Sequence, residues 1–143
     1  MKAVIIDDEE DVRVTLKLLL TKYLPNVHVT GEADGVAKAL EVIDTRKPDL
    51  LFLDLEMSDG TGFDLLDKLP ESTKVIFVTA HSEYALKAFK YSAVDYLLKP
   101  VDPLELVEAV NKALRITEEQ QSFEALKDNL SEQAPSKLIL KDM

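Results

Sequence analysis

The apolar run Leu50-Leu51-Phe52-Leu53, which ends on the carboxylate of Asp54, constrains the fold more than any other stretch. Four consecutive large apolar residues between Pro48-Asp49 and a glycine-containing turn are typical of a strand buried on both faces. Open parallel sheets place their ligand sites at the carboxyl ends of such strands. Asp54 is therefore predicted to be the reacting group.

Similar apolar runs alternate with helical patterns along the chain. Strands are predicted over residues 3–6, 27–30, 50–53, 75–78 and 96–98. Helices are predicted over 11–23, from a cap at Asp34 to Lys47-Pro48, through Phe63, Leu66 and Leu69, through Tyr84, Leu86, Ala88 and Phe89, and from Pro103 onward. Five strand–helix units imply a doubly wound α/β fold, in which helices cover both faces of a five-stranded parallel sheet.

Length and charge exclude several classes of protein. A chain of 143 residues holds one domain and at most a tail. Its net charge of −10 argues against nucleic-acid binding by this segment, because phosphate backbones are bound by clustered Lys and Arg. No apolar run approaches the roughly 20 residues of a membrane span, so no membrane partner is expected. The absence of cysteine excludes disulfides and fits a cytoplasmic protein.

Polar residues follow four of the predicted strands directly. They are Asp7-Asp8, Asp54, Thr79 and Lys99. Because the carboxyl ends of parallel strands share one edge, three carboxylates, a hydroxyl and an ammonium are expected to converge.

This constellation predicts phosphoryl chemistry. Converging carboxylates need a counter-charge, and an all-oxygen site suits Mg²⁺. Lys99 and Thr79 offer donors to phosphoryl oxygens. Asp54 beside a metal and an ammonium is a plausible nucleophile toward phosphorus, giving an acyl phosphate.

The four motifs resemble the signatures of bacterial response-regulator receiver domains (CheY-like). They are Ile5-Ile6-Asp7-Asp8-Glu9, Leu51-Phe52-Leu53-Asp54-Leu55-Glu56-Met57, Val78-Thr79-Ala80 and Leu98-Lys99-Pro100. The resemblance covers residues 1–115. It implies a (βα)5 flavodoxin-like fold with strand order 2-1-3-4-5 and an extended last helix, and phosphorylation of Asp54 by a sensor histidine kinase.

The resemblance also assigns roles to individual residues. Asp8, Asp54 and the Glu56 carbonyl would hold Mg²⁺, with Asp7 acting mostly through water. Thr79, Lys99 and the Ala80 amide would contact the phosphoryl oxygens. Tyr96 would be a switch residue that moves with Thr79, and the Lys99-Pro100 bond would be cis.

A narrower resemblance is to receivers of the LytTR (LytR/AlgR-type) class. It is carried by the segments Thr79-Ala80-His81-Ser82-Glu83-Tyr84 and Val94-Asp95-Tyr96-Leu97-Leu98-Lys99-Pro100-Val101. In that class a DNA-binding domain follows the receiver and controls transcription. Residues 116–136 would be a linker or a helix extension, and residues 137–143 would begin the DNA-binding domain. The sequence would then be a shortened form of a longer regulator, and the alternative is a receiver that stands alone.

Three further residues lie near the expected site. Ser58 stands where receivers usually have proline, which predicts a less rigid loop without loss of activity. His81 is interpreted as a lone exposed histidine in preference to a group that controls water. The Glu56 side chain either screens the site from water or points outward.

Two functions from different classes follow. The first is a phosphorylation-driven switch, not an enzyme beyond its own phosphorylation and slow dephosphorylation. It homodimerises through the face of the fourth helix, fifth strand and fifth helix. The second is an aspartyl-phosphate phosphatase like the haloacid dehalogenases. Those enzymes need a second Asp, two residues after the nucleophile, as the general acid and base, and this chain has Glu56 there. A nucleotide-binding module is disfavoured because Asp7-Asp8-Glu9-Glu10 replaces a glycine-rich phosphate loop.

Overall fold

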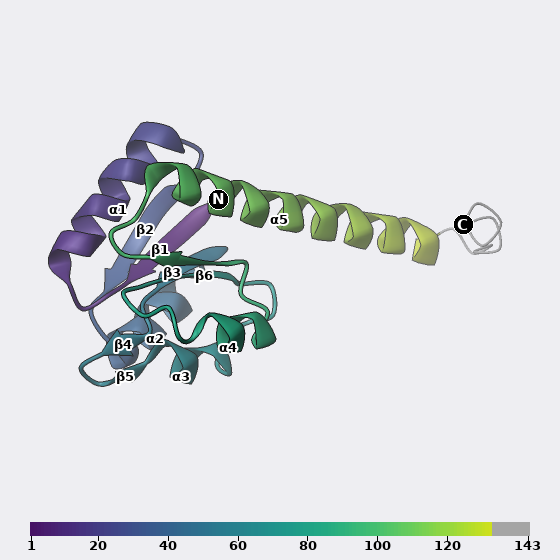
Figure 1. Cartoon of the computed structure of the whole chain (residues 1–143). Helices are drawn as coiled ribbons and strands as arrows, with labels where there is room; N and C mark the ends of the chain where they lie inside the picture. Colours follow the sequence, from purple (N-terminus) through teal and green to yellow (C-terminus); the bar gives the residue numbers. More distant parts are fainter. Residues whose placement is uncertain (133–143) are drawn as a thin grey trace.

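The computed structural model describes residues 1–132 and shows a central sheet with helices on both faces (Figure 1). The sheet strands are β1 (Lys2–Ile6), β2 (His28–Ala33), β3 (Leu50–Leu53), β6 (Lys74–Thr79) and β7 (Asp95–Leu98). The helices are α1 (Glu10–Tyr23), α2 (Val36–Arg46), α3 (Gly62–Leu66), α4 (Ala85–Lys90) and α5 (Pro103–Glu132). The predicted start of a second domain at residues 137–143 lies outside the described residues.

The sheet has the predicted topology. Its order is β2-β1-β3-β6-β7 and every pairing is parallel, which confirms the order 2-1-3-4-5 for the five long strands. The pairs Ile6↔Leu53 and Leu53↔Phe77 align the strand ends. The residues that follow β1 and β3 therefore lie at one edge.

Alternating side chains of the strands build two cores. On one face Ile5 and Phe52 pack with α1 and α5, and on the other Ile6 and Leu53 pack with α2, α3 and α4. All four residues of β3 are buried, as a central strand with both faces covered requires. This burial holds the strand end at Asp54 in place.

The structure corrects three predictions of secondary structure. Asp34 does not cap α2. Instead the Asp59 carboxylate accepts hydrogen bonds from the amides of Val36 and Ala37, at 2.8 and 3.1 Å. Gly35 at the N-cap makes room for that carboxylate, because a Cβ there would lie 2.7 Å from Asp59 Oδ1. The second strand, predicted over 27–30, extends further and ends at Ala33.

The third correction concerns the segment before α3. A short antiparallel hairpin, β4 (Glu56–Met57) with β5 (Gly60–Thr61), occupies the predicted turn after Asp54.

In α4 only Ala88 is buried, so most side chains of this helix face solvent. Leu86 and Phe89 are exposed.

The last helix is extended, as predicted. It runs for 30 residues and projects from the body, coloured green to yellow in Figure 1. The Lys99-Pro100 bond that precedes it is cis, also as predicted. Among the described residues no helix combines the length and apolarity needed to cross a membrane.

Gly62 lets α3 begin directly against the end of β3. Its amide donates to the Leu55 carbonyl at 2.9 Å, and a Cβ on it would lie 2.5 Å from the Asp54 carbonyl oxygen. Since that neighbour is backbone, it cannot rotate away, and a side chain at residue 62 must displace the Asp54 segment.

We expect Gly62→Ala to lower the free energy of unfolding by about 1–3 kcal/mol, as overpacking does in a closely packed interior. Urea denaturation measures the loss. Ser58→Ala, on the exposed tip of the same loop, is the control and should stay within about 0.5 kcal/mol of wild type. An unchanged midpoint for Gly62→Ala would contradict the close approach.

Candidate functional site

The polar strand ends meet at one edge of the sheet. The Asp7 amide donates to the Ala33 carbonyl, the Asp54 amide to Ile6 and the Lys99 amide to Thr79, at 2.8–3.0 Å, so each residue continues the strand pairing. Asp7 is 1% and Asp54 5% exposed, whereas Asp8 faces solvent. Strand geometry therefore positions these side chains before any ligand binds.

The Lys99 ammonium lies at the centre of the group. Its Nζ is 2.9 Å from Asp7 Oδ2, 3.2 Å from Asp54 Oδ2 and 3.3 Å from Glu9 Oε1. The Lys99 side chain is only 13% exposed. One cation thus faces three carboxylates, two of them buried.

Burial dominates the ionisation of the group. Desolvation raises the pKa of Asp7 and of Asp54 above the usual value, although Lys99 opposes the shift in both. Burial also lowers the pKa of Lys99, but its contacts with Asp7 and Asp54 outweigh this, and the net shift is upward. Lys99 therefore stays charged, and its single positive charge faces the negative charges of two buried carboxylates.

The residues present fit a divalent cation. Ligand oxygens of Asp7, Asp8 and Asp54 lie within 4.8 Å of one another. Asp7 Oδ2 is buried, and its partner among the described residues is the Lys99 ammonium, which it shares with Asp54 and Glu9. A set of carboxylate oxygens that share one cation suits a hard ion such as Mg²⁺.

Two further predicted residues border the same hollow. Thr79 is fully buried, and its Oγ1 accepts a hydrogen bond from the His81 amide at 3.3 Å. Ala80 lines the hollow together with Asp8, Asp54, Glu56 and Lys99. All predicted site residues except Asp7, Thr79 and Tyr96 line this hollow, and Asp7 and Thr79 contact two residues of its lining, Lys99 and His81.

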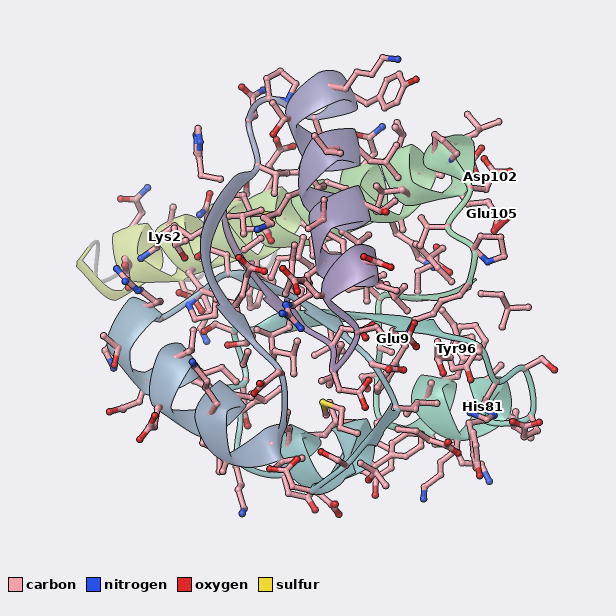
Figure 2. The ribbon with its side chains drawn as sticks, turned by 90° about the vertical axis from the view of Figure 1, so that its left-hand side faces the viewer. Lys2, Glu9, His81, Tyr96, Asp102 and Glu105 are labelled. Carbon is pink, nitrogen blue, oxygen red and sulfur yellow. The ribbon has the colours of Figure 1, made fainter. Side chains whose placement is uncertain are left out.

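Tyr96 is connected to the loop that follows Thr79. Its hydroxyl donates to the His81 carbonyl, and its ring packs on Phe77 at a centroid distance of 6.0 Å (Figure 2). The two ends of the side chain therefore contact β6 and the loop after it.

The interpretation of His81 as an isolated surface residue is wrong. Its Nε2 lies 3.0 Å from Glu56 Oε2 and its Nδ1 2.9 Å from Glu83 Oε1. The Glu56 side chain, left undecided from sequence, points to this histidine. Sequence reasoning missed the pairing because it joins two loops that are far apart along the chain.

Glu9, labelled in Figure 2, belongs to the first motif without a predicted role, and its Oε1 lies 3.3 Å from Lys99 Nζ in the structure. Its position directly after Asp7-Asp8 could have indicated that Glu9 lies near the site.

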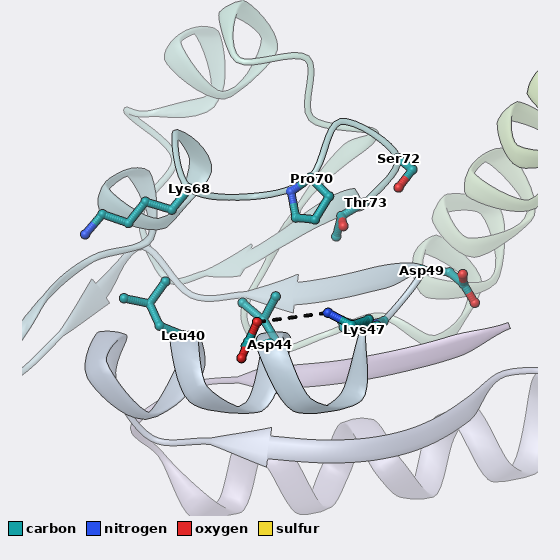
Figure 3. Close-up of a pocket in the computed structure, with 10 residues that line it drawn as sticks. Leu40, Asp44, Lys47, Asp49, Lys68, Pro70, Ser72 and Thr73 are labelled. Atoms are coloured by element: carbon teal, nitrogen blue, oxygen red, sulfur yellow. Dashed lines mark ion pairs between the residues drawn. The ribbon is translucent and has the colours of Figure 1, made fainter.

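A second hollow, at the opposite end of the sheet, lies apart from this cluster. It is formed by the C-terminal part of α2 and the loop before β6, with Leu40, Lys47, Pro70 and Thr73 among its walls (Figure 3). Asp44 and Lys47 form an ion pair of 4.0 Å at its rim. It contains none of the strand-end residues, so the chemistry belongs to the other edge.

Comparison with known proteins gives concordant matches. The family model of the response regulator receiver domain matches residues 3–111. The sensory transduction protein LytT of Enterococcus faecalis is 39% identical over 138 residues, which cover 94% of this chain and 54% of that protein. The transcriptional regulatory protein LytR of Staphylococcus aureus is 39% identical over 115 residues, which cover 78% of this chain and 46% of that protein. The chain thus spans about half the length of these relatives.

Solved structures agree with the fold. The receiver domain of AraT, a response regulator from Geobacillus stearothermophilus, aligns with a TM-score of 0.73 at 32% identity, covering 83% of this chain and 97% of that one. The response regulatory domain of MrkE from Klebsiella pneumoniae gives 0.73 at 27% identity, covering 83% and 99%. By its sequence, its sheet and its strand-end acids, the chain belongs to the response regulator receiver domain family.

Proposed function

We propose that this chain is a phosphorylation-driven switch that accepts a phosphoryl group from a sensor histidine kinase on Asp54. The observation that carries the proposal is the contact of Lys99 Nζ with both Asp54 and Asp7. Together with Asp8, these two residues bring three carboxylate oxygens within 4.8 Å of one another. A nucleophilic carboxylate, a cation and an acidic metal site thus share one edge.

The residues divide the work as follows. An oxygen of Asp54 bonds to phosphorus as the phosphorus–nitrogen bond of the kinase phosphohistidine breaks. Asp8, Asp54 and the Glu56 carbonyl would hold Mg²⁺, and Asp7 would act mostly through water. When bound, Mg²⁺ offsets negative charge on the carboxylates and the phosphoryl oxygens. Lys99, Thr79 and the Ala80 amide bind those oxygens.

The switch follows from the charge that phosphorylation adds. A phosphoryl group brings roughly −1.5 to −2 charges and three acceptor oxygens. The Thr79 side chain turns toward the phosphoryl group and exchanges its hydrogen bond with the His81 amide for one to a phosphoryl oxygen. Tyr96 moves as well, because its hydroxyl donates a hydrogen bond to the His81 carbonyl. Two packings thus differ in contacts with the ligand, as a population shift requires.

The output surface is the face of α4, β7 and α5, and its partner is a second copy of the chain. Leu86, Phe89, Leu98 and Leu104 are 45–70% exposed on these elements. A set of large apolar side chains in water on the switching elements favours a regulated apolar interface.

The wider setting is proposed from the relatives. LytR of Staphylococcus aureus is a transcriptional regulatory protein roughly twice as long as the matched segment. We infer that this chain is the receiver of a LytTR-class regulator in the cytoplasm. Residues 116–136 would then connect it to a DNA-binding domain that begins near residue 137.

The phosphatase alternative gains no support from the geometry. It needs a free acid two residues after the nucleophile, and the Glu56 side chain is paired with His81. Turnover distinguishes the two functions, because a phosphatase releases phosphate repeatedly whereas a receiver retains one equivalent.

We expect incubation with acetyl phosphate and Mg²⁺ to add the mass of one phosphoryl group, and Asp54→Asn to abolish the addition because the amide is not a nucleophile toward phosphorus. Intact-mass spectrometry measures this. Asp44→Asn, which alters an exposed carboxylate remote from the site, is the control and should be labelled as wild type. A labelled Asp54→Asn protein would refute Asp54 as acceptor.

Without a divalent cation, the charge on Asp54 should destabilise the fold. Its pKa is raised in the folded state, so the stability it contributes is present below the unfolded pKa and is lost as pH rises through the folded pKa. In EDTA at neutral pH, Asp54→Asn should therefore raise Tm and flatten its decline between acidic and neutral pH. Asp44→Asn, at a remote exposed carboxylate, should not. A lowered Tm for Asp54→Asn would mean that the ionised Asp54 carboxylate stabilises the fold instead.

Phosphorylation is expected to produce dimers through the α4–β7–α5 face. With beryllofluoride and Mg²⁺, sedimentation should show a dimer, and Leu86→Asp should raise the dimer Kd by about tenfold or more because it buries a charge. Leu18→Asp, at an equally exposed leucine on α1, should dimerise as wild type. Identical monomer masses with and without the phosphate mimic would reject the interface.

A further inference from the structure

The peptide between Asp7 and Asp8 has an unusual partner. The Asp7 amide donates to Ala33, and Asp7 Oδ1 accepts from the Glu9 amide at 2.9 Å. The Asp7 carbonyl lies beyond the last paired residue of β1, where no strand supplies a donor. Arg13 Nη1 donates to it at 2.7 Å.

Arg13 is itself fixed in place by β2. Its Nε lies 3.2 Å from Glu32 Oε1, and Lys17, one turn later in α1, places Nζ 2.7 Å from Glu32 Oε2. The Arg13 side chain is 17% exposed and that of Lys17 39%. The contact with Lys17 is the largest cause that lowers the pKa of Glu32, which keeps this carboxylate charged. The guanidinium therefore makes a sheltered bridge between β2 and the turn after β1.

The bridge acts on the acidic site through the backbone. The Asp7 carbonyl and the Asp8 amide belong to one planar peptide unit, so fixing the carbonyl fixes the direction in which Asp8 leaves the strand. Asp7 is buried and held by three other contacts, whereas Asp8 is exposed and its side chain accepts no hydrogen bond among the described contacts. Asp8 thus depends on this peptide for its placement.

We propose that Arg13, oriented by Glu32, is a positioning residue that sets the Asp7–Asp8 turn for divalent-cation binding. The inference rests on the proposed function, since it assigns Arg13 a part in the same metal site. The effect of removing Arg13 on cation affinity distinguishes a positioning role from a simple charge effect. A positive guanidinium near the site repels a cation, so loss of its charge alone would tighten cation binding. Loss of a positioning contact would weaken cation binding.

Calorimetric titration of the metal-free protein with Mg²⁺ separates the two. We expect Arg13→Met to raise the Mg²⁺ Kd about tenfold, the effect typical of lost outer contacts at metal sites. Lys17→Met is the matched control, because it removes the same charge from the same Glu32 without touching Asp7. Its Kd should stay within about twofold of wild type, as for a partly exposed ion pair. Faster hydrogen exchange of the Asp8 amide in Arg13→Met, and not in Lys17→Met, is the second expected result.

Other results of the Mg²⁺ titration would reject either the proposed function or the role of Arg13. If wild type fails to bind Mg²⁺ at millimolar concentration, the proposed function fails. If wild type binds but Arg13→Met binds equally or more tightly, or if Lys17→Met weakens binding as much, only the positioning role is overturned. Should Arg13→Met not fold, Arg13→Lys replaces it. A lysine keeps the charge, but its single nitrogen cannot occupy both the Nε position 3.2 Å from Glu32 and the Nη1 position 2.7 Å from the Asp7 carbonyl. The same weakening is therefore expected.

Discussion

The charge balance at Lys99 is the constraint on which the site depends. A single ammonium, 13% exposed, compensates two buried carboxylates and contacts a third at the surface. Buried like charges are costly unless paired, and here one cation is shared among several. The fold tolerates this because β1, β3, β6 and β7 are locked by two cores that hold the strand ends regardless of their charge. Apolar packing therefore holds the strand ends together against the repulsion among their carboxylates.

The same imbalance explains how the edge is suited to its chemistry. Asp7 and Asp54 share the Lys99 ammonium, and burial raises the pKa values of both carboxyl groups. A divalent cation bound among these carboxylates would offset their negative charge. Functional sites often carry such locally unfavourable arrangements.

The sequence predicted the convergence of Asp7, Asp54, Thr79 and Lys99 because it follows from strand ends and from parallel pairing alone. It could not predict contacts that depend on side-chain direction between distant loops, such as His81 with Glu56. Glu32 shows the reason for another miss. The edge strand β2 has a weak apolar pattern, and its predicted end at residue 30 left Glu32 outside the sheet, so the partner of Arg13 could not be identified. Asp59 likewise caps α2 across 23 residues of intervening chain.

The length of α5 gives the domain a mechanical property. Ile116 is the last described residue of this helix in the apolar core, Phe123 and Glu124 border a hollow beside Ser72, and the helix continues to Glu132. At 1.5 Å per residue the part beyond Glu124 is about 12 Å long, so a tilt of about 5° at Glu124 moves the tip by about 1 Å. A small rearrangement of side chains beside β7 would thereby move the far end of α5, at a distance from the strand-end carboxylates.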